Sequence, residues 1–120
     1  MNEIKQGFKV VTEKDGKLVS ASVGLKLVKY AIGENAMPRT FCGPLTVFSD
    51  ASAINGFIKD LPTGKAYRVF KCNYVPTDMK SVHRLTVNGG LESRDLSSLP
   101  MGTRLAKSIY LTEEIKPTKF

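Results

Sequence analysis

The alternation of apolar and polar residues near the start of the chain predicts β-strands. Gly7–Thr12 alternates with a period of two residues, which is typical of a strand with one buried face. Lys14-Asp15-Gly16-Lys17 follows, and Asp-Gly between two such runs is a strong signal for a β-hairpin. We therefore predict a hairpin whose second strand is 18–23, with residues 25–30 continuing the same sheet.

A helical period replaces this pattern in the middle of the chain. Between 53 and 61, apolar residues recur at three- and four-residue spacing, which places them on one face of a helix. They are Ala53, Ile54, Phe57, Ile58 and Leu61. Ser49 or Asp50 can cap this helix by accepting hydrogen bonds from the free N–H groups of its first turn. The spacing predicts one main helix, at about 50–61.

Further strands are expected at 45–48, 66–74 and 104–111. Residues 31–44 and 77–100 are rich in Gly, Pro and polar residues and are predicted to be irregular, apart from a short strand at 85–87. The expected fold is α+β, a mostly antiparallel sheet with the helix inserted between strands. At 120 residues, the chain is predicted to form a single domain, 1–120.

Composition places the chain among ordinary globular proteins. Hydrophobic residues make up 42% and charged residues 24%, which argues against a disordered chain. No apolar run approaches the ~20 residues that span a bilayer, and the N-terminus lacks a signal-peptide core, so no membrane partner is expected. Cys42 and Cys72 form no disulfide framework and are expected to be buried small hydrophobes. The chain is therefore expected to be cytoplasmic.

Few schemes of catalysis fit these residues. His83 is the only histidine, its sequence context places it near neither cysteine, and its polar surroundings favour a solvated loop. Carboxylates do not cluster at metal-ligand spacing, and Gly89-Gly90 matches no phosphate-binding loop. We predict no catalytic residues, no metal site and no cofactor, so the protein is not expected to be an enzyme.

Anion binding remains, because 18 Lys and Arg against 11 Asp and Glu give a net charge of +7. Most of these cations are expected to form a solubilising surface. Arg39 lies in the Gly- and Pro-rich connection, whereas Arg68 and Arg104 lie on or beside predicted strands. An Arg beside an aromatic such as Phe70 can pair with phosphate in two places while the ring stacks on a base. These residues are therefore candidate ligand-binding positions.

The order of short motifs resembles small proteins encoded by phages and prophages. The motifs are Gly7-Phe8-Lys9-Val10-Val11, Gly16-Lys17-Leu18-Val19-Ser20-Ala21, Gly43-Pro44-Leu45-Thr46-Val47-Phe48, Tyr67-Arg68-Val69-Phe70-Lys71-Cys72, Leu99-Pro100-Met101-Gly102-Thr103-Arg104 and Leu111-Thr112-Glu113-Glu114. Among such proteins, the chain is most similar to the anti-Thoeris sponges that sequester cyclic ADP-ribose-type immune signals. The resemblance implies a homo-oligomer in the host-cell cytoplasm that holds its ligand without cleaving it. Arg104, then Arg68 and Phe70, are the positions it singles out, and Asn88 is a further candidate.

The leading hypothesis is a phage-encoded anti-defence protein that sequesters a small anionic nucleotide, either of cyclic ADP-ribose type or a cyclic dinucleotide. The alternative is an inhibitor of a host nucleic-acid machine that acts, like an anti-CRISPR protein, by binding nucleic acid or protein. The basic charge suits direct contact with nucleic acid, and such binding should weaken steeply with salt. A virion assembly protein is the third hypothesis, for which no residue argues either way.

Overall fold

In the computed structural model, the described residues, which are 3–14, 16–20, 28–37, 44–59, 67–85, 90–99 and 101–115, form nine β-strands, one short α-helix and one turn of 3₁₀ helix. The elements in chain order are β1 (Lys5–Lys14), β2 (Lys17–Ser20), β3 (Lys29–Tyr30), β4 (Asn35–Ala36), β5 (Leu45–Phe48), α1 (Ser52–Lys59), β6 (Tyr67–Pro76), β7 (Ser81–Leu85), β8 (Leu91–Asp95), η1 (Leu96–Ser98) and β9 (Thr103–Ile115).

The predicted N-terminal hairpin is confirmed. β1 pairs antiparallel with β2, and Lys14 lies opposite Lys17 beside the turn. Gly16 has a φ of 78°, a left-handed conformation that glycine adopts without steric cost. β3 then pairs with β2, with Leu18 opposite Tyr30, so the sheet continues as expected. The end of the predicted second strand, 21–23, lies outside the described residues.

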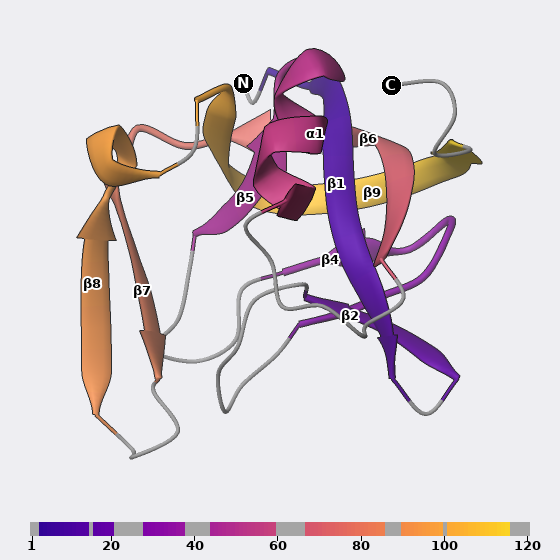
Figure 1. Ribbon diagram of the computed structural model, residues 1–120, viewed down its shortest axis with the longest axis horizontal. Helices are drawn as coiled ribbons and strands as arrows, with labels where there is room; N and C mark the ends of the chain where they lie inside the picture. Colours follow the sequence, from indigo (N-terminus) through magenta and orange to yellow (C-terminus); the bar gives the residue numbers. More distant parts are fainter. Residues whose placement is uncertain are drawn as a thin grey trace.

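Four strands close into a barrel (Figure 1). β1 pairs with β6, β6 with β9, β9 with β5, and β5 returns to β1 through the single pair Phe8 and Phe48. All of these pairs are antiparallel. Closure removes exposed strand edges from this part of the sheet.

β9 is the strand that holds the barrel together, because it pairs with β4, β5 and β6. Its register against β6 shifts at Lys71/Cys72 and again at Val75/Pro76. The first shift leaves Thr112 as an extra residue, and its Oγ1 donates to the carbonyl of Lys71 at 3.1 Å. Such bulges increase the local twist, which lets a strand of 13 residues coil around a small barrel.

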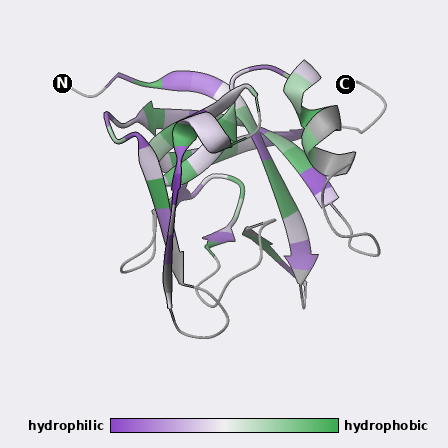
Figure 2. Cartoon of the chain, turned by 60° about the vertical axis from the view of Figure 1, so that its left-hand side comes forward, coloured by the Kyte–Doolittle hydropathy of each residue, from purple (hydrophilic) through white to green (hydrophobic). Residues whose placement is uncertain are grey.

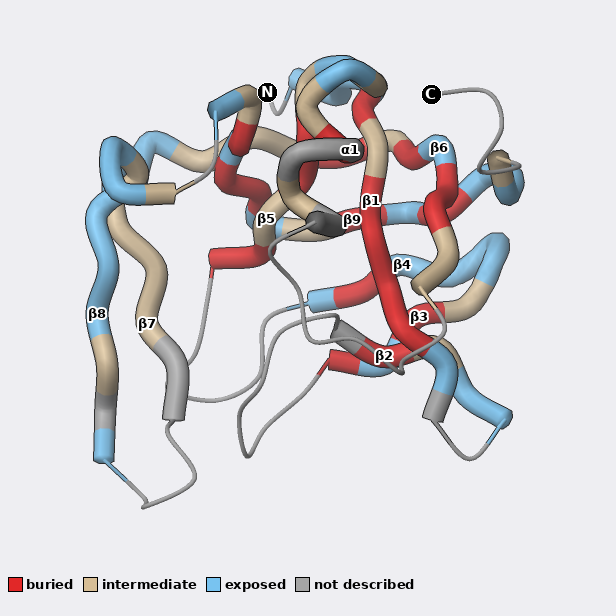
Figure 3. Tube along the Cα trace, viewed as in Figure 1, coloured by how far each residue is buried: buried red, intermediate tan, exposed pale blue. Residues whose placement is uncertain are grey.

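The hydrophobic core lies on both sides of the barrel wall. The interior cluster comprises Val11, Val28, Tyr30, Ala36, Leu45, Val47, Phe70, Cys72, Tyr74, Ala106, Ile109 and Leu111. A second cluster, made by Val10, Phe48, Ile54 and Val69, is buried beneath α1 on the outer face. Apolar and polar positions alternate along the long strands in Figure 2, and the buried stretches converge on the barrel in Figure 3.

The prediction of one main helix at about 50–61 is wrong, because α1 has only eight residues. Asp50, not Ser49, caps it, since the Asp50 Oδ1 accepts a hydrogen bond from the N–H of Ala53 at 3.2 Å. Ile54 is fully buried, and the rings of Phe48 and Phe57 lie 4.9 Å apart. Two helical turns cover only one patch of the barrel. The protein is therefore a mostly antiparallel β-sheet protein, richer in strand than the α+β prediction stated.

The prediction that 77–100 is irregular is also wrong. β7 and β8 form an antiparallel hairpin from the Ser81–Asp95 pair to the Leu85–Leu91 pair. Its sequence lacks a clear apolar alternation because the hairpin stands beside the barrel rather than within its wall (Figure 1). The described part of 31–44 likewise contains β4, which pairs with β9 through Asn35 and Tyr110.

Strands predicted at 45–48, 66–74 and 104–111 are confirmed as β5, β6 and β9, the last two being longer than expected. Among the described residues, no helix has the length and apolar character needed to cross a membrane.

Candidate functional site

Several charged or ionisable side chains lie on the interior face of the barrel. Residues directly opposite each other in an antiparallel pair share a face of the sheet. On β1 and β6, Arg68 lies opposite Val11, Phe70 opposite Lys9, and Cys72 opposite Gly7. Since Phe70 and Cys72 belong to the interior cluster, Lys9 and Arg68 lie on the same inward side. The candidate site is therefore this inner face and its two ends.

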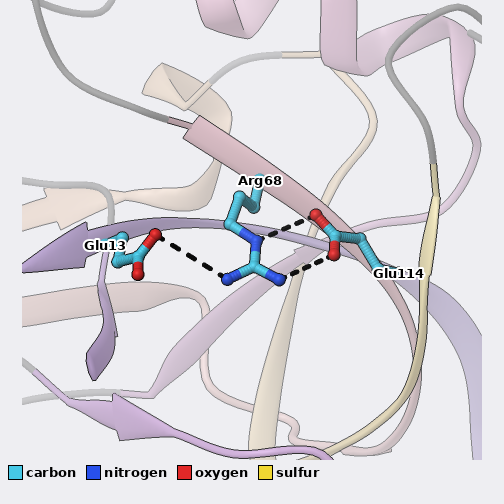
Figure 4. Close-up of polar contacts among 3 residues, drawn as sticks. All are labelled: Glu13, Arg68 and Glu114. Carbon is cyan, nitrogen blue, oxygen red and sulfur yellow. Dashed lines mark hydrogen bonds and ion pairs between the residues drawn. The ribbon is translucent and has the colours of Figure 1, made fainter. Parts of the chain in front are cut away.

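Arg68 lies at one end in an ion-pair cluster with Glu13 and Glu114, which we call the Arg68 cluster (Figure 4). Its Nε and Nη2 donate to the two carboxylate oxygens of Glu114 at 2.8 and 2.7 Å. Its Nη1 lies 3.9 Å from a carboxylate oxygen of Glu13. The hydrogen bond to Glu114 raises the pKa of Arg68, with the charges of both glutamates adding to the effect.

The Arg68 cluster is not built to bind an anion. Two carboxylates surround one guanidinium, and the forked donors that would grip a phosphate already hold Glu114. Phe70 is next to Arg68 as predicted, with the guanidinium carbon 5.4 Å from the ring centroid. Its side chain is 0% exposed, however, so the ring has no open face in this structure, and its role as a stacking surface for a base stays a prediction. The ring is buried because it points into the barrel.

Arg104 lies far along β9 from Glu114, and the carboxylate nearest to it in electrostatic effect is that of Asp50, whose pKa is lowered first by its hydrogen bonds at the start of α1 and further by the charge of Arg104. It is opposite Val47, a residue of the interior cluster, and is nonetheless exposed. In the described part of the chain its Nη1 donates to the carbonyl of Thr103 at 3.0 Å, and it forms no ion pair there. Burial raises the pKa of Tyr74, and the positive charge of Arg104 acts in the opposite direction, which places the two groups within electrostatic range.

Lys9 is a buried cation that the sequence did not single out. It is 7% exposed, and its Nζ donates to the carbonyl of Thr46 at 2.7 Å. The Nζ also lies 5.4 Å from the ring centroid of Tyr30. Burial lowers the pKa of Lys9 to about 8, with only partial opposition from the thiol of Cys72. β5 pairs with β1 at Phe8 alone, and Lys9 binds a β5 carbonyl next to that point, which ties the seam of the barrel together.

Cys72 and His83 carry less chemistry. Cys72 is a free, buried cysteine, as predicted, and burial raises the pKa of its thiol to about 11, which keeps it protonated and unreactive. His83 was expected in a solvated loop, but it lies half-buried on β7 opposite Ser93. Cys42 lies outside the described residues.

Two further candidates, Arg39 and Asn88, also lie outside the described residues, so their predicted roles stay predictions. The structure brings Arg68 and Phe70 together, whereas Arg104 lies at a separate position on β9. Among the described residues, no three His, Cys, Asp or Glu side chains gather into a group that could hold a metal ion.

Comparison with known protein families, with curated proteins and with solved structures yields no match to this chain. The arrangement of its own residues therefore carries the functional argument.

Proposed function

We propose that this protein is a non-catalytic binding protein that sequesters a small anionic nucleotide at the Arg104 end of the barrel. The observation that carries the proposal is the contrast between two inward-side arginines. Arg68 is held by two carboxylates, whereas Arg104 is exposed and makes no ion pair within the described residues. A guanidinium in this state has donors ready for bidentate contact with a phosphate.

The net charge of +7 supports the same proposal at longer range. A positive surface raises the local concentration of anions and speeds their association. Lys107, three residues after Arg104, is equally exposed and makes no ion pair in the described part of the chain, but it is not part of the proposed site and can therefore serve as a control position. The ligands to test first are cyclic ADP-ribose isomers and cyclic dinucleotides, which are the class named by the sequence resemblance.

Arginine substitution tests this proposal directly. A ligand that binds only the native state raises the melting temperature, by an amount equivalent to about 2.7 kcal/mol at a concentration of 100 times Kd. We expect Arg104→Ala to weaken binding about tenfold or more, as loss of a charged hydrogen-bonding group does. Arg104→Lys should also weaken it, because lysine keeps the charge but lacks the planar fork. Lys107→Ala, which removes one exposed cation from the same strand, is the matched control and should bind nearly as well as the parent.

The outcome separates the function classes. Ligand recovered unchanged by chromatography supports sequestration, and ligand recovered in altered form would mean catalysis. Equal binding by the parent and Arg104→Ala would remove Arg104 from the site. If no nucleotide binds but single- or double-stranded nucleic acid does, with affinity falling steeply as salt rises, the alternative of an inhibitor of nucleic-acid machinery takes over.

A further inference from the structure

The β7–β8 hairpin, which we call the arm (Ser81–Leu85 and Leu91–Asp95), stands apart from the barrel. In the described part of the chain, its two strands pair with each other and with no other strand. β8 is the outer strand of the arm in Figures 1 and 3. Ser93, Arg94 and Asp95 are exposed, whereas the β7 residues Ser81, Val82 and His83 are half-buried.

An arm of this kind has an open edge. The outer side of β8 presents backbone N–H and C=O groups that no other described strand engages. A two-stranded hairpin by itself is at best marginally stable in water, and independent stability takes three or more strands with an apolar face. A strand added to β8 would bond the backbone groups of this edge and would widen the two-stranded sheet.

The order of charges along β8 indicates that the added strand is β8 of a second copy of this chain. The sequence is Leu91-Glu92-Ser93-Arg94-Asp95. When two copies pair antiparallel about an axis through Ser93, Glu92 of each copy lies opposite Arg94 of the other. Opposite charges in directly facing positions stabilise an antiparallel pair.

Neighbouring registers lack this match. An axis at Glu92 places two glutamates opposite each other, and an axis at Arg94 places two arginines opposite each other. No axis can lie between two residues of β8, because it would pair neighbouring residues, whose side chains lie on opposite faces of the sheet. A like-charge pair opposes association, so the pattern favours one register.

We propose that β8 is a homodimer interface, in which two copies of this chain pair antiparallel about a two-fold axis at Ser93 and their arms form one four-stranded sheet. The contact is isologous, so it closes at two subunits. Pairing of two β7 strands would not be favoured in the same way, because an axis at His83 sets Arg84 opposite Val82 and brings no opposite charges together. The interface lies on the arm and is separate from the Arg104 site, so neither proposal depends on the other.

Charge reversal with rescue tests the pairing and its register. Arg94→Glu sets a second carboxylate opposite Glu92 of the other copy, and Glu92→Arg sets a second guanidinium opposite Arg94. Because position 92 also lies opposite Arg84 within the arm, every Glu92→Arg change is made together with Arg84→Glu, which keeps that internal pair of opposite charge. Each variant alone should be a monomer in sedimentation velocity at concentrations where the parent is a dimer. An equimolar mixture should form a heterodimer, because both facing pairs of positions 92 and 94 are then of opposite charge. The double variant Glu92→Arg/Arg94→Glu should again self-associate.

A cysteine cross-link tests the position of the axis without disturbing the charges. In an antiparallel pair, facing Cα atoms lie about 4.5–5.5 Å apart, which is within the range of a disulfide. In a Cys42→Ser background, Ser93→Cys should form a disulfide-linked dimer under mild oxidation. Ser97→Cys, an exposed position in η1 beyond the paired strand, is the control and should remain largely monomeric.

The proposal is overturned if the parent remains monomeric at the highest concentration at which it stays in solution, or if both cysteine variants cross-link equally. It is also overturned if the parent is a dimer that neither charge reversal affects, since the dimer then uses another surface. A failure of nucleotide binding with the β8 dimer intact would count against the proposed function alone.

Discussion

At the scale of single residues, Lys9 joins β1 to β5, but the burial of its charge lowers the free energy of unfolding. Its ammonium group is buried and satisfied by the carbonyl of Thr46. In the unfolded chain its pKa is near 10.5, whereas burial lowers it to about 8 in the fold. When Lys9 is charged in both the folded and the unfolded state, this difference in pKa corresponds to a free energy of about 3 kcal/mol that favours the unfolded chain.

The pH dependence of stability follows from this pKa. Because Lys9 loses its proton in the native state first, the free energy of unfolding should rise as the pH increases from about 8 toward 10.5. Cys72 acts in the opposite direction above about pH 9, because its thiol pKa is raised to about 11 in the fold. We therefore expect the clearest effect between pH 8 and 9, where the parent should gain about 1 kcal/mol relative to Lys9→Met. Urea titrations of both proteins at pH 7, 8 and 9 measure this gain, and parallel pH profiles would contradict it.

At the scale of elements, the short helix depends on its cap. The hydroxyl of Ser52 donates to the Asp50 carboxylate at 2.5 Å, and the N–H of Ala53 donates to the same oxygen at 3.2 Å. These hydrogen bonds, that of Ser52 first, lower the pKa of Asp50. A helix of two turns has few internal hydrogen bonds, so each N-terminal partner matters to it.

Asp50→Ala should lower the urea midpoint without changing the m-value, because the cap is lost but the surface exposed on unfolding is not altered. Ser49→Ala, the neighbouring candidate cap, is the control and should have a smaller effect. Since the pKa of Asp50 is lowered in the fold, the cap stabilises the protein above about pH 3.8 and is lost as the pH falls through the folded value. The difference between the parent and Asp50→Ala should therefore shrink in acid.

At the scale of the whole molecule, the barrel is closed by contacts between distant parts of the chain. β1 and β6 pair from Lys5–Tyr74 to Thr12–Tyr67, and β6 and β9 pair along almost the whole length of β6. Phe70 lies in the middle of these three strands, opposite Lys9 on one side and Glu114 on the other. Its ring is therefore part of the joint that closes the sheet.

Phe70→Ala should destabilise the protein by about 3–5 kcal/mol, because it removes a fully buried ring and leaves a cavity. Tyr110→Ala, an exposed aromatic on β9, is the control and should cost far less. Chemical denaturation followed by far-UV circular dichroism and by tyrosine fluorescence measures both, and we expect the two signals to coincide because the closed sheet unfolds as one unit. A small effect of Phe70→Ala would mean that its side chain is not in the core.

The sequence by itself determined the local elements of this protein. Alternation and the Asp-Gly turn predict the first hairpin, and helical spacing after Asp50 locates α1, although it overstates its length. These signals are local, since they depend on residues a few positions apart. They say little about the arm, where polar residues on both strands hide the β-pattern.

Only the tertiary structure decided which side chains serve the interior and which remain available. Arg68 and Arg104 look alike in the sequence. Strand pairing brings the carboxylates of Glu13 and Glu114 to Arg68. In the described part of the chain, it brings no carboxylate within ion-pair distance of Arg104. Phe70 looks like a stacking surface beside Arg68 until the barrel closes over it. Lys9 looks solvent-exposed until β5 brings a backbone carbonyl to its amine. That carbonyl is 37 residues away from Lys9 along the chain, and Glu114 is 46 residues away from Arg68, so no local pattern can reveal either partner.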